Sequence, residues 1–278
     1  DFCLAPWAIP NGVFCRRARA RTGVPYAVWS LGSDVQVYGR KPVLKRMVRN
    51  VLSDADLLFA NSRRLTRAIE SLAGRVPGLM STSRLLPKTD IPALDLGTDR
   101  RHLLFVGRLE PVKGIDLLVG AMGRLAADGA NLDLHVLGDG SMRKGLEREV
   151  ATRGLQDRIF FKGFADATSV AAHLMACDLL VIPSRSEGMP VVFHEAMQAG
   201  VPVAATDVGD LGEVIRAYGV GAVARSVSSD GIAEAIEEAL SRDRATLLER
   251  ADEVWRQFDI QASARTFSEA IRKARHLR

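Results

Sequence analysis

The stretch CDLLVIPSRSEGMPVVFHEAMQAGVPVAATDVGD, residues 177–210, indicates the fold class because two short apolar runs enclose a helix-forming segment. CDLLVIPS (177–184) and GVPVAATDVGD (200–210) each run into a loop, which is typical of strands in a parallel sheet. Proline is tolerated in the first turn of a helix, so the Gly-Met-Pro corner at 188–190 predicts a helix start. Strand, helix and strand in this order predict an α/β fold with parallel sheets.

Apolar runs outside this stretch extend the same alternation. They are YAVWSLGSD (26–34), ADLLFANS (55–62), RHLLFVGRL (101–109), NLDLHVLGDG (131–140) and RIFFKGF (158–164). Asn61 or Ser62 is expected to cap the helix that follows the second of these runs. The strands between about residues 101 and 240 predict a complete doubly wound sheet, and residues 251–277 are helical in pattern.

The chain is expected to form two Rossmann-like lobes. Residues 85–100 (LLPKTDIPALDLGTDR) hold two prolines and little periodicity, which predicts a linker. We therefore expect one lobe at residues 1–95 and a second at 96–278. The first is expected to be incomplete at its N-terminus, because DFCLAPWAIPNG (1–12) already resembles a mid-sheet strand.

The composition is that of a globular protein that is not embedded in a membrane. Among 278 residues, 47% are hydrophobic and 26% charged, and no apolar run is long enough to span a bilayer. Three cysteines without paired metal spacing favour a reducing, cytoplasmic location. Residues 1–95 hold 15 Lys and Arg against 7 Asp and Glu, an excess that indicates either an anionic partner or solvated surface charge.

Two cations follow the strand at 101–109. In open α/β sheets, ligands bind beyond the carboxyl ends of the strands. Arg108 and Lys113, in GRLEPVKG, are five residues apart around a proline turn, so they are able to converge on a diphosphate. The alternative is a solvated loop with incidental charges.

The helix start at 188–190 is a second candidate site. Free N–H groups near Gly188, Met189, Pro190 and Val191, with the positive end of the helix dipole, suit an anion or hydroxyl groups. Glu187 and Glu195 are acceptors suited to sugar or ribose hydroxyls. In the alternative interpretation, Glu187 stabilises the helix dipole and Glu195 forms a salt bridge.

Three other sequence features are weaker evidence for a functional site. Gly138 and Gly140 resemble part of a dinucleotide fingerprint, but Arg143 takes the place of the third glycine, so a tight turn that lines a nucleotide pocket is preferred to a nicotinamide site. The Asp-Ala-Asp at 54–56 matches a metal motif of sugar transferases, yet it precedes a strand and is expected to be a turn. The histidines are scattered and predict no metal site.

The order of these motifs resembles a known family. FVGRLEPVKGIDLLVGAM, LHVLGDG, IFFKGF, CDLLVIPSRSEGMPVVFHEAMQAGVPVAATDVGDLGEVI and GVG are similar to the nucleotide-binding lobe of retaining glycosyltransferases of the GT-B fold, family four. The Glu-x7-Glu pair formed by Glu187 and Glu195 is the hallmark of that family. Residues 1–85 are similar more loosely, through GSDV and ADLLFANS.

The resemblance implies roles for the candidate residues. It makes Arg108 and Lys113 the holders of the donor diphosphate, Glu187 the residue beside the transferred sugar and Glu195 the acceptor for the ribose hydroxyls. It places the backbone of Phe164 at the base. It implies donor-site positions for Gly107, Gly138 and 188–191, no metal cofactor, and a last helix that crosses back to the first lobe.

Departures from the family pattern fall on the acceptor side. Leu31 stands ahead of the GSDV glycine, where relatives often carry histidine. A non-catalytic nucleotide-sugar-binding protein is therefore the alternative to a transferase, and a GT-B epimerase is a third interpretation. The sequence does not identify the sugar or the particular acceptor. The donor is expected to be a UDP- or GDP-sugar, and the acceptor is expected to be a saccharide or a lipid-linked molecule.

The segment KPVLKRMVRNVL (41–52) bears on a membrane partner. Lys41, Lys45 and Arg49 recur at four-residue spacing, and Leu44, Val48, Val51 and Leu52 form an apolar side. Such a helix is expected either to lie on an anionic bilayer, giving peripheral contact with the inner membrane face, or to turn its apolar side to the core.

Overall fold

The computed structural model describes residues 2–87, 91–257 and 260–276, which separate into two compact units. Unit 1 contains residues 2–82, 187–189 and 260–276, and unit 2 contains the described residues of 83–186 and 190–257. The sequence places the boundary at residue 95, within a linker at 85–100. The observed division at 82 differs because residues 84–86 hydrogen-bond to a helix of unit 2. Part of the predicted linker, 88–90, lies outside the described residues.

The sheet of unit 1 is parallel, with strand order β1-β2-β3-β4. Its strands are β1 (Cys3–Pro6), β2 (Tyr26–Ser30), β3 (Leu57–Ala60) and β4 (Gly78–Leu79). Its helices are η1 (Ala8–Gly12), α1 (Val13–Thr22), α2 (Ser33–Gln36), η2 (Tyr38–Arg40), α3 (Pro42–Asp54), α4 (Arg63–Ala73) and α12 (Ile260–His276). Ser62 caps α4, as predicted, by accepting a 3.2 Å hydrogen bond from the Leu65 N–H.

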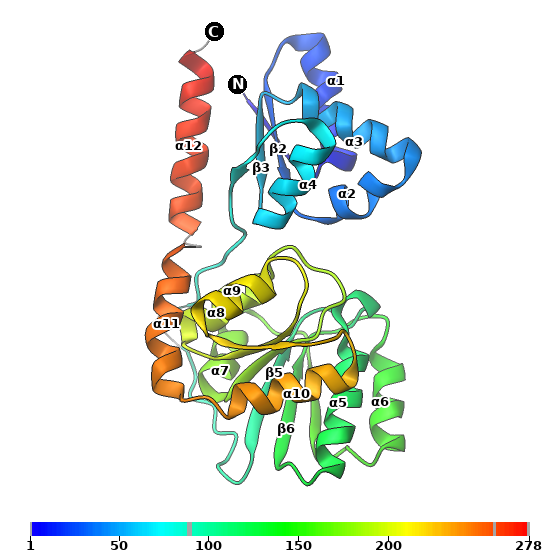
Figure 1. Cartoon of the computed structure of the whole chain (residues 1–278), viewed down its shortest axis with the longest axis vertical. Helices are drawn as coiled ribbons and strands as arrows, with labels where there is room; N and C mark the ends of the chain where they lie inside the picture. The colour runs from blue at the N-terminus through cyan, green and yellow to red at the C-terminus, as the bar shows by residue number, and fades with distance from the viewer. Residues whose placement is uncertain (1, 88–90, 258–259, 277–278) are drawn as a thin grey trace. The chain divides into compact units, whose positions relative to one another are not determined.

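The two faces of this sheet are covered by different parts of the chain (Figure 1). One face, with Tyr26 and Val28, packs against the helices α1 to α4. The other face, with Ala27 and Phe59, packs against α12, where the rings of Phe59 and Phe267 lie 5.4 Å apart. Successive residues of β2 therefore contribute to two separate apolar clusters, as the alternation of side chains along a strand requires.

Helix α3 resolves the two expectations for residues 41–52. Val48, Val51 and Leu52 are buried in the core of unit 1 and Leu44 is half-buried. The apolar side is thus occupied by the protein's own core, while the basic residues on the opposite side are exposed. Among the described helices, none is both long enough and apolar enough to cross a membrane.

Unit 2 contains a second parallel sheet, with strand order β10-β9-β8-β5-β6-β7. Its strands are β5 (Arg101–Val106), β6 (Leu132–Leu137), β7 (Ile159–Gly163), β8 (Leu179–Ile182), β9 (Val203–Thr206) and β10 (Gly221–Ala224). The order reverses between β5 and β8: the chain moves outward from β5 to β7, and then restarts at β8 on the other side of β5. Ligand crevices of doubly wound sheets lie at such a reversal.

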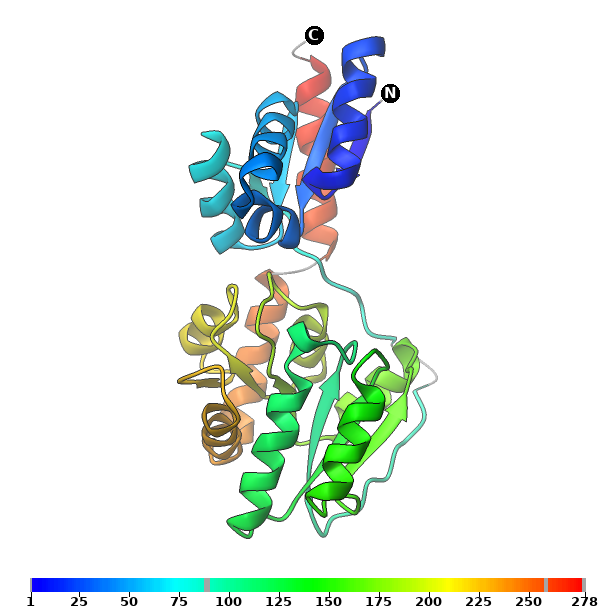
Figure 2. The same cartoon turned by 90° about the vertical axis from the view of Figure 1, so that its right-hand side faces the viewer.

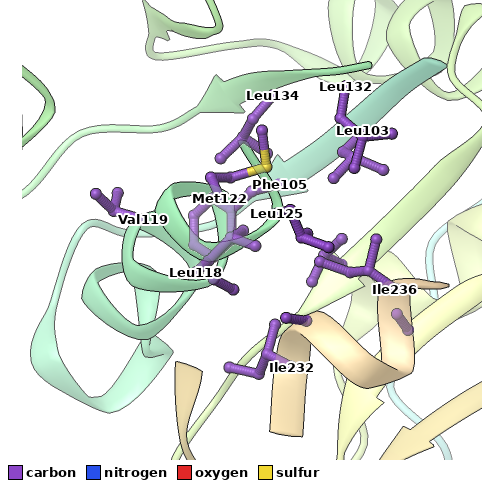
Figure 3. Close-up of a cluster of buried hydrophobic side chains, with 14 of the residues drawn as sticks. Leu103, Phe105, Leu118, Val119, Met122, Leu125, Leu132, Leu134, Ile232 and Ile236 are labelled. Carbon is purple, nitrogen blue, oxygen red and sulfur yellow. The ribbon is translucent and has the colours of Figure 1, made fainter. Parts of the chain in front are cut away.

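Helices cover both faces of this sheet, with α5 and α6 in front of it in Figure 2. They are η3 (Pro111–Lys113), α5 (Ile115–Ala127), α6 (Arg143–Thr152), α7 (Ala167–Ala176), α8 (Val191–Ala199), α9 (Leu211–Tyr218), α10 (Ser229–Leu240) and α11 (Arg244–Gln257). Figure 3 shows Met122 and Leu125 of α5 meeting Leu103 of β5 and Ile236 of α10 in one buried cluster. This continuous core holds the strand ends, and the loops beyond them, in fixed positions.

Candidate functional site

Three loops of unit 2 meet beyond the carboxyl ends of β5, β6 and β7. The Gly107 N–H donates to the Leu137 carbonyl at 3.0 Å, and the Gly138 N–H donates to the Gly163 carbonyl at 2.7 Å. The predicted donor-site residues Gly107 and Gly138 therefore lie on adjacent strand ends, with Phe164 following the third. Phe164 is 88% exposed, so its side chain is not part of the core of unit 2.

Gly138 is required by close packing of two of these loops. Its φ is +138°, and a Cβ built on it would lie 1.9 Å from the Gly107 carbonyl oxygen. No larger residue fits at this distance, and the backbone conformation itself favours glycine. The glycine pair predicted to form a tight turn thus brings the β6 loop against the β5 loop.

The β5 loop carries both predicted cations. Arg108 is exposed at the strand end, and Lys113 is half-buried at the end of η3. Gly114, with φ +67°, follows Lys113, and a Cβ on it would lie 1.9 Å from the Pro183 carbonyl oxygen beyond β8. The cation-bearing loop is therefore pressed against the loop that leads from β8 toward α8.

Arg185 ties these two loops together, and the sequence gives no sign of it. Its Nη1 and Nη2 donate to the Asp116 carboxylate at 2.8 and 2.7 Å, and Nη1 also donates to the Pro111 carbonyl at 2.7 Å. The hydrogen bonds from Arg185 lower the pKa of Asp116, and the same pairing raises the pKa of Arg185. The fork geometry fixes η3, and with it Lys113, relative to the end of β8.

Glu110 supports the same loop from the other side. Its carboxylate accepts hydrogen bonds from the Ser141 N–H at 3.0 Å and from the Ser141 hydroxyl at 2.7 Å. These bonds, with the hydroxyl contribution the larger, lower the pKa of Glu110. Glu110 thus links the β5 loop to the β6 loop by accepting hydrogen bonds from Ser141.

Helix α8 begins at Val191, with Pro190 in the N-cap position one residue before the predicted first turn. Pro190 makes no side-chain cap hydrogen bond to the N–H groups at the helix start. Glu195 lies in the middle of the helix and is 2% exposed. Its Oε1 accepts a 2.6 Å hydrogen bond from Nε of Arg84 and pairs with Nη2 of the same guanidinium. The salt bridge considered for Glu195 from the sequence is therefore present.

The corner Glu187–Met189 groups with unit 1 and Glu195 with unit 2. In unit 1, a Cβ on Gly188 would lie 2.8 Å from Oδ1 of Asn61, so a larger residue at 188 would require the Asn61 side chain to shift. The Thr82 hydroxyl donates to the Met189 carbonyl at 3.4 Å. Asn61, expected only as a cap, is buried, and among the described residues its Oδ1 accepts no hydrogen bond.

The remaining motifs have structural uses. Asp54 pairs with Arg16 at 2.6 Å and Asp56 with Arg19 at 3.0 Å, so the Asp-Ala-Asp segment holds α1 beside α3 and β3. His102, His135 and His173 gather on one face of the unit 2 sheet, with 3.2 Å between Nδ1 of His102 and Nε2 of His135. Within residues 2–87, 91–257 and 260–276, no group of three metal-ligating side chains is found.

Comparison with known proteins adds to this geometry. The family described as Glycosyl transferases group 1 matches residues 88–256, more than half of the chain. The chain is 34% identical, over 93% of its length and 71% of the relative's, to an uncharacterised glycosyltransferase of Methanocaldococcus jannaschii. It is 28% identical, over 86% of its length and 66% of the relative's, to a GDP-mannose-dependent α-(1-6)-phosphatidylinositol monomannoside mannosyltransferase of Mycolicibacterium smegmatis.

A similar solved structure is that of HepE from Anabaena in complex with UDP. It aligns with a TM-score of 0.82 and 21% identity, over 98% of this chain and 79% of that one, and a second structure of HepE holds UDP-glucose. Together with the two parallel sheets, this likeness confirms the predicted GT-B fold. The chain spans less than half the length of several curated relatives that it matches.

Proposed function

Since this chain belongs to the family of glycosyl transferases group 1, we propose that it moves a sugar from a nucleotide-activated donor to an acceptor hydroxyl. The observation that supports the proposal most directly is the loop beyond β5, which is held in place by contacts with the β8 loop. Its two cations, Arg108 and Lys113, stand at the reversal of strand order, and Arg185 and Gly114 fix it against β8. Such a loop suits a diphosphate.

The chemistry follows from charge. Breaking the bond between the sugar and the phosphate leaves negative charge on the diphosphate and an oxocarbenium-like sugar. Arg108, Lys113 and the N–H groups at the start of α8 stabilise the diphosphate, and such preorganised donors contribute the most where charge develops. We assign Glu187 to the transferred sugar and Glu195 to the ribose hydroxyls. In this proposal the protein cations take the place of a metal ion, and the sugar keeps its anomeric configuration.

The donor is proposed to be a UDP- or GDP-sugar. UDP and UDP-glucose are bound in the similar HepE structures, and the mycobacterial relative is named for its dependence on GDP-mannose. That relative acts on a phosphatidylinositol mannoside, which supports a lipid-linked or saccharide acceptor here.

We also propose a cytoplasmic location with peripheral contact at an anionic membrane. The three cysteines are free thiols, which suits a reducing compartment. Because the apolar side of α3 is buried in the core of unit 1, the contact is assigned to its exposed basic residues Lys41, Lys45 and Arg49. Such a contact weakens with salt.

Calorimetric titration of the chain with UDP, GDP and ADP, with and without EDTA, tests the donor site. We expect one nucleotide to bind with micromolar affinity, unchanged by chelation, because protein cations hold the diphosphate. Loss of binding in EDTA would refute metal independence. If a folded chain binds none of the three nucleotides, the proposed donor site is wrong.

The second candidate, a nucleotide-sugar-binding protein without transfer, is favoured by Leu31, which stands where relatives often carry histidine. The same titration with intact UDP-glucose and GDP-mannose separates the two candidates. Slow release of free sugar from the bound donor favours the transferase, whereas binding without any bond cleavage favours the second candidate.

A further inference from the structure

Residues 84–86, which precede β5 in the chain, lie along α8. The Leu86 N–H donates to Oε1 of Gln198 at 3.0 Å, and Nε2 of Gln198 donates to the Arg84 carbonyl at 2.7 Å. One side-chain amide thus satisfies a backbone donor and a backbone acceptor two residues apart. Gln198 is three residues beyond Glu195, so the two side chains share a face of α8.

This clamp delivers the Arg84 guanidinium to Glu195. Nε and Nη2 of Arg84 both contact Oε1 of Glu195, with Nε at 2.6 Å. The Glu195 side chain is 2% exposed and that of Arg84 is 49% exposed. A nearly buried carboxylate needs a charged partner, and here the partner reaches it from the solvent side.

Both Arg84 nitrogens fall on the same carboxylate oxygen. Oε2 therefore takes no hydrogen bond from Arg84, while the pair of contacts holds Oε1 in place. Because both donors belong to one planar guanidinium, they restrict the position of Oε1 more than a single contact would.

We propose that Arg84 is a positioning residue for donor binding, which holds Oε1 of Glu195 so that Oε2 accepts the ribose 2′-hydroxyl. The inference rests on the proposed function, because it takes Glu195 as the ribose acceptor. Arg84 lies before the region that the family matches, residues 88–256. The Gln198 clamp makes the arrangement specific to this side chain and not to any nearby cation.

The preference for ribose over deoxyribose measures this orientation. Affinities for UDP and 2′-deoxy-UDP, and for GDP and 2′-deoxy-GDP, are determined by calorimetry on the full chain. For the base that binds, we expect wild type to prefer the ribonucleotide by about tenfold or more, the usual effect of a hydrogen bond to a charged group. Arg84→Met is expected to bring the preference close to one, and Arg84→Lys to restore it in part.

The matched control is Arg101→Met. Arg101 is also a partly exposed arginine paired with a carboxylate, Asp178 at 3.5 Å, but it lies at the start of β5, away from the carboxyl ends. It should keep the wild-type preference. Gln198→Leu keeps the guanidinium but removes the clamp, and it is expected to give an intermediate preference, so it decides the question if Arg84→Met does not fold.

The outcomes separate the inference from the proposed function. If Arg84→Met weakens both nucleotides equally and the ribose preference stays, Arg84 is only structural and the inference is overturned while the donor site stands. If wild type shows no ribose preference, Glu195 does not bind the 2′-hydroxyl, and the inference fails with that assignment. If the wild-type chain binds none of the nucleotides, the proposed function itself fails.

Discussion

Lys113 is the side chain for which a change should separate chemistry from folding. We expect Lys113→Ala to lower the rate of donor hydrolysis or transfer by roughly a hundredfold, because one preorganised donor to the developing charge is lost. The melting temperature should change little, since Lys113 is only half-buried. Steady-state kinetics and a thermal melt measure the two effects.

Lys144→Ala on α6 is the matched control for Lys113, because Lys144 is an exposed lysine outside the β5 loop. This variant should leave both the rate of donor hydrolysis or transfer and the melting temperature unchanged. Equal rates in the two variants would remove Lys113 from the catalytic assignment.

At this scale the sequence predicts residues that follow a strand, and it misses partners that are distant along the chain. Arg108 and Gly138 are found because each stands at the end of an apolar run, and Lys113 because it follows Arg108 around a proline turn. Arg84 and Arg185 are not, because their carboxylate partners lie 111 and 69 residues away. Only the folded chain brings such pairs together, and no local pattern marks them.

Among the elements, the tie between Arg185 and Asp116 joins the β5 and β8 loops, and a double-mutant cycle tests it. We expect Arg185→Met and Asp116→Asn each to lower turnover by about tenfold, because a shifted Lys113 is poorly placed. The double variant should lose no more than either single variant, since the two side chains act as one unit. The hydrogen bonds from Arg185 lower the pKa of Asp116, so its carboxylate is charged at neutral pH, where turnover is measured.

Independent contributions would contradict the tie, and they would appear as a loss of about a hundredfold in the double variant. Arg153→Met serves as the control. Arg153 pairs with Glu149 within α6, on the surface, and its loss should leave turnover unchanged.

The strands of unit 2 were predictable because strands buried on both faces are continuous apolar runs. β10 is the exception: Gly221–Ala224 is short and contains small residues, so it gives no comparable signal. The sequence pattern of residues 41–52 predicts a helix with an apolar side, but it does not tell whether that side contacts a bilayer or the protein core. The contacts of the chain divide at residue 82 and not at 95 because the Gln198 clamp joins residues 84–86 to α8, and such a tertiary contact leaves no local pattern.

For the molecule as a whole, acid should destabilise unit 2 before carboxylates protonate. Burial lowers the pKa of His135 to about 4, with smaller contributions from His102, Lys162 and His173, and burial lowers that of His194 to about 4 as well. The unfolded chain therefore binds more protons, so the free energy of unfolding falls between about pH 6.5 and 4, by on the order of 2 kcal/mol for each histidine.

Thermal melts at pH 7.5, 6 and 5 measure this dependence. His135→Leu should reduce the change of melting temperature with pH, while Lys144→Ala should leave that change as in wild type. An unchanged slope in His135→Leu would show that His135 does not contribute to the acid sensitivity.

The placement of α12 has a consequence for synthesis on the ribosome. The face of the unit 1 sheet that holds Ala27 and Phe59 is covered by residues of α12, including Phe267. Translation makes β1 to β4 first, then all of unit 2, and only then this helix. Nascent unit 1 thus has an uncovered apolar face while unit 2 is made, and chaperones bind such surfaces during translation.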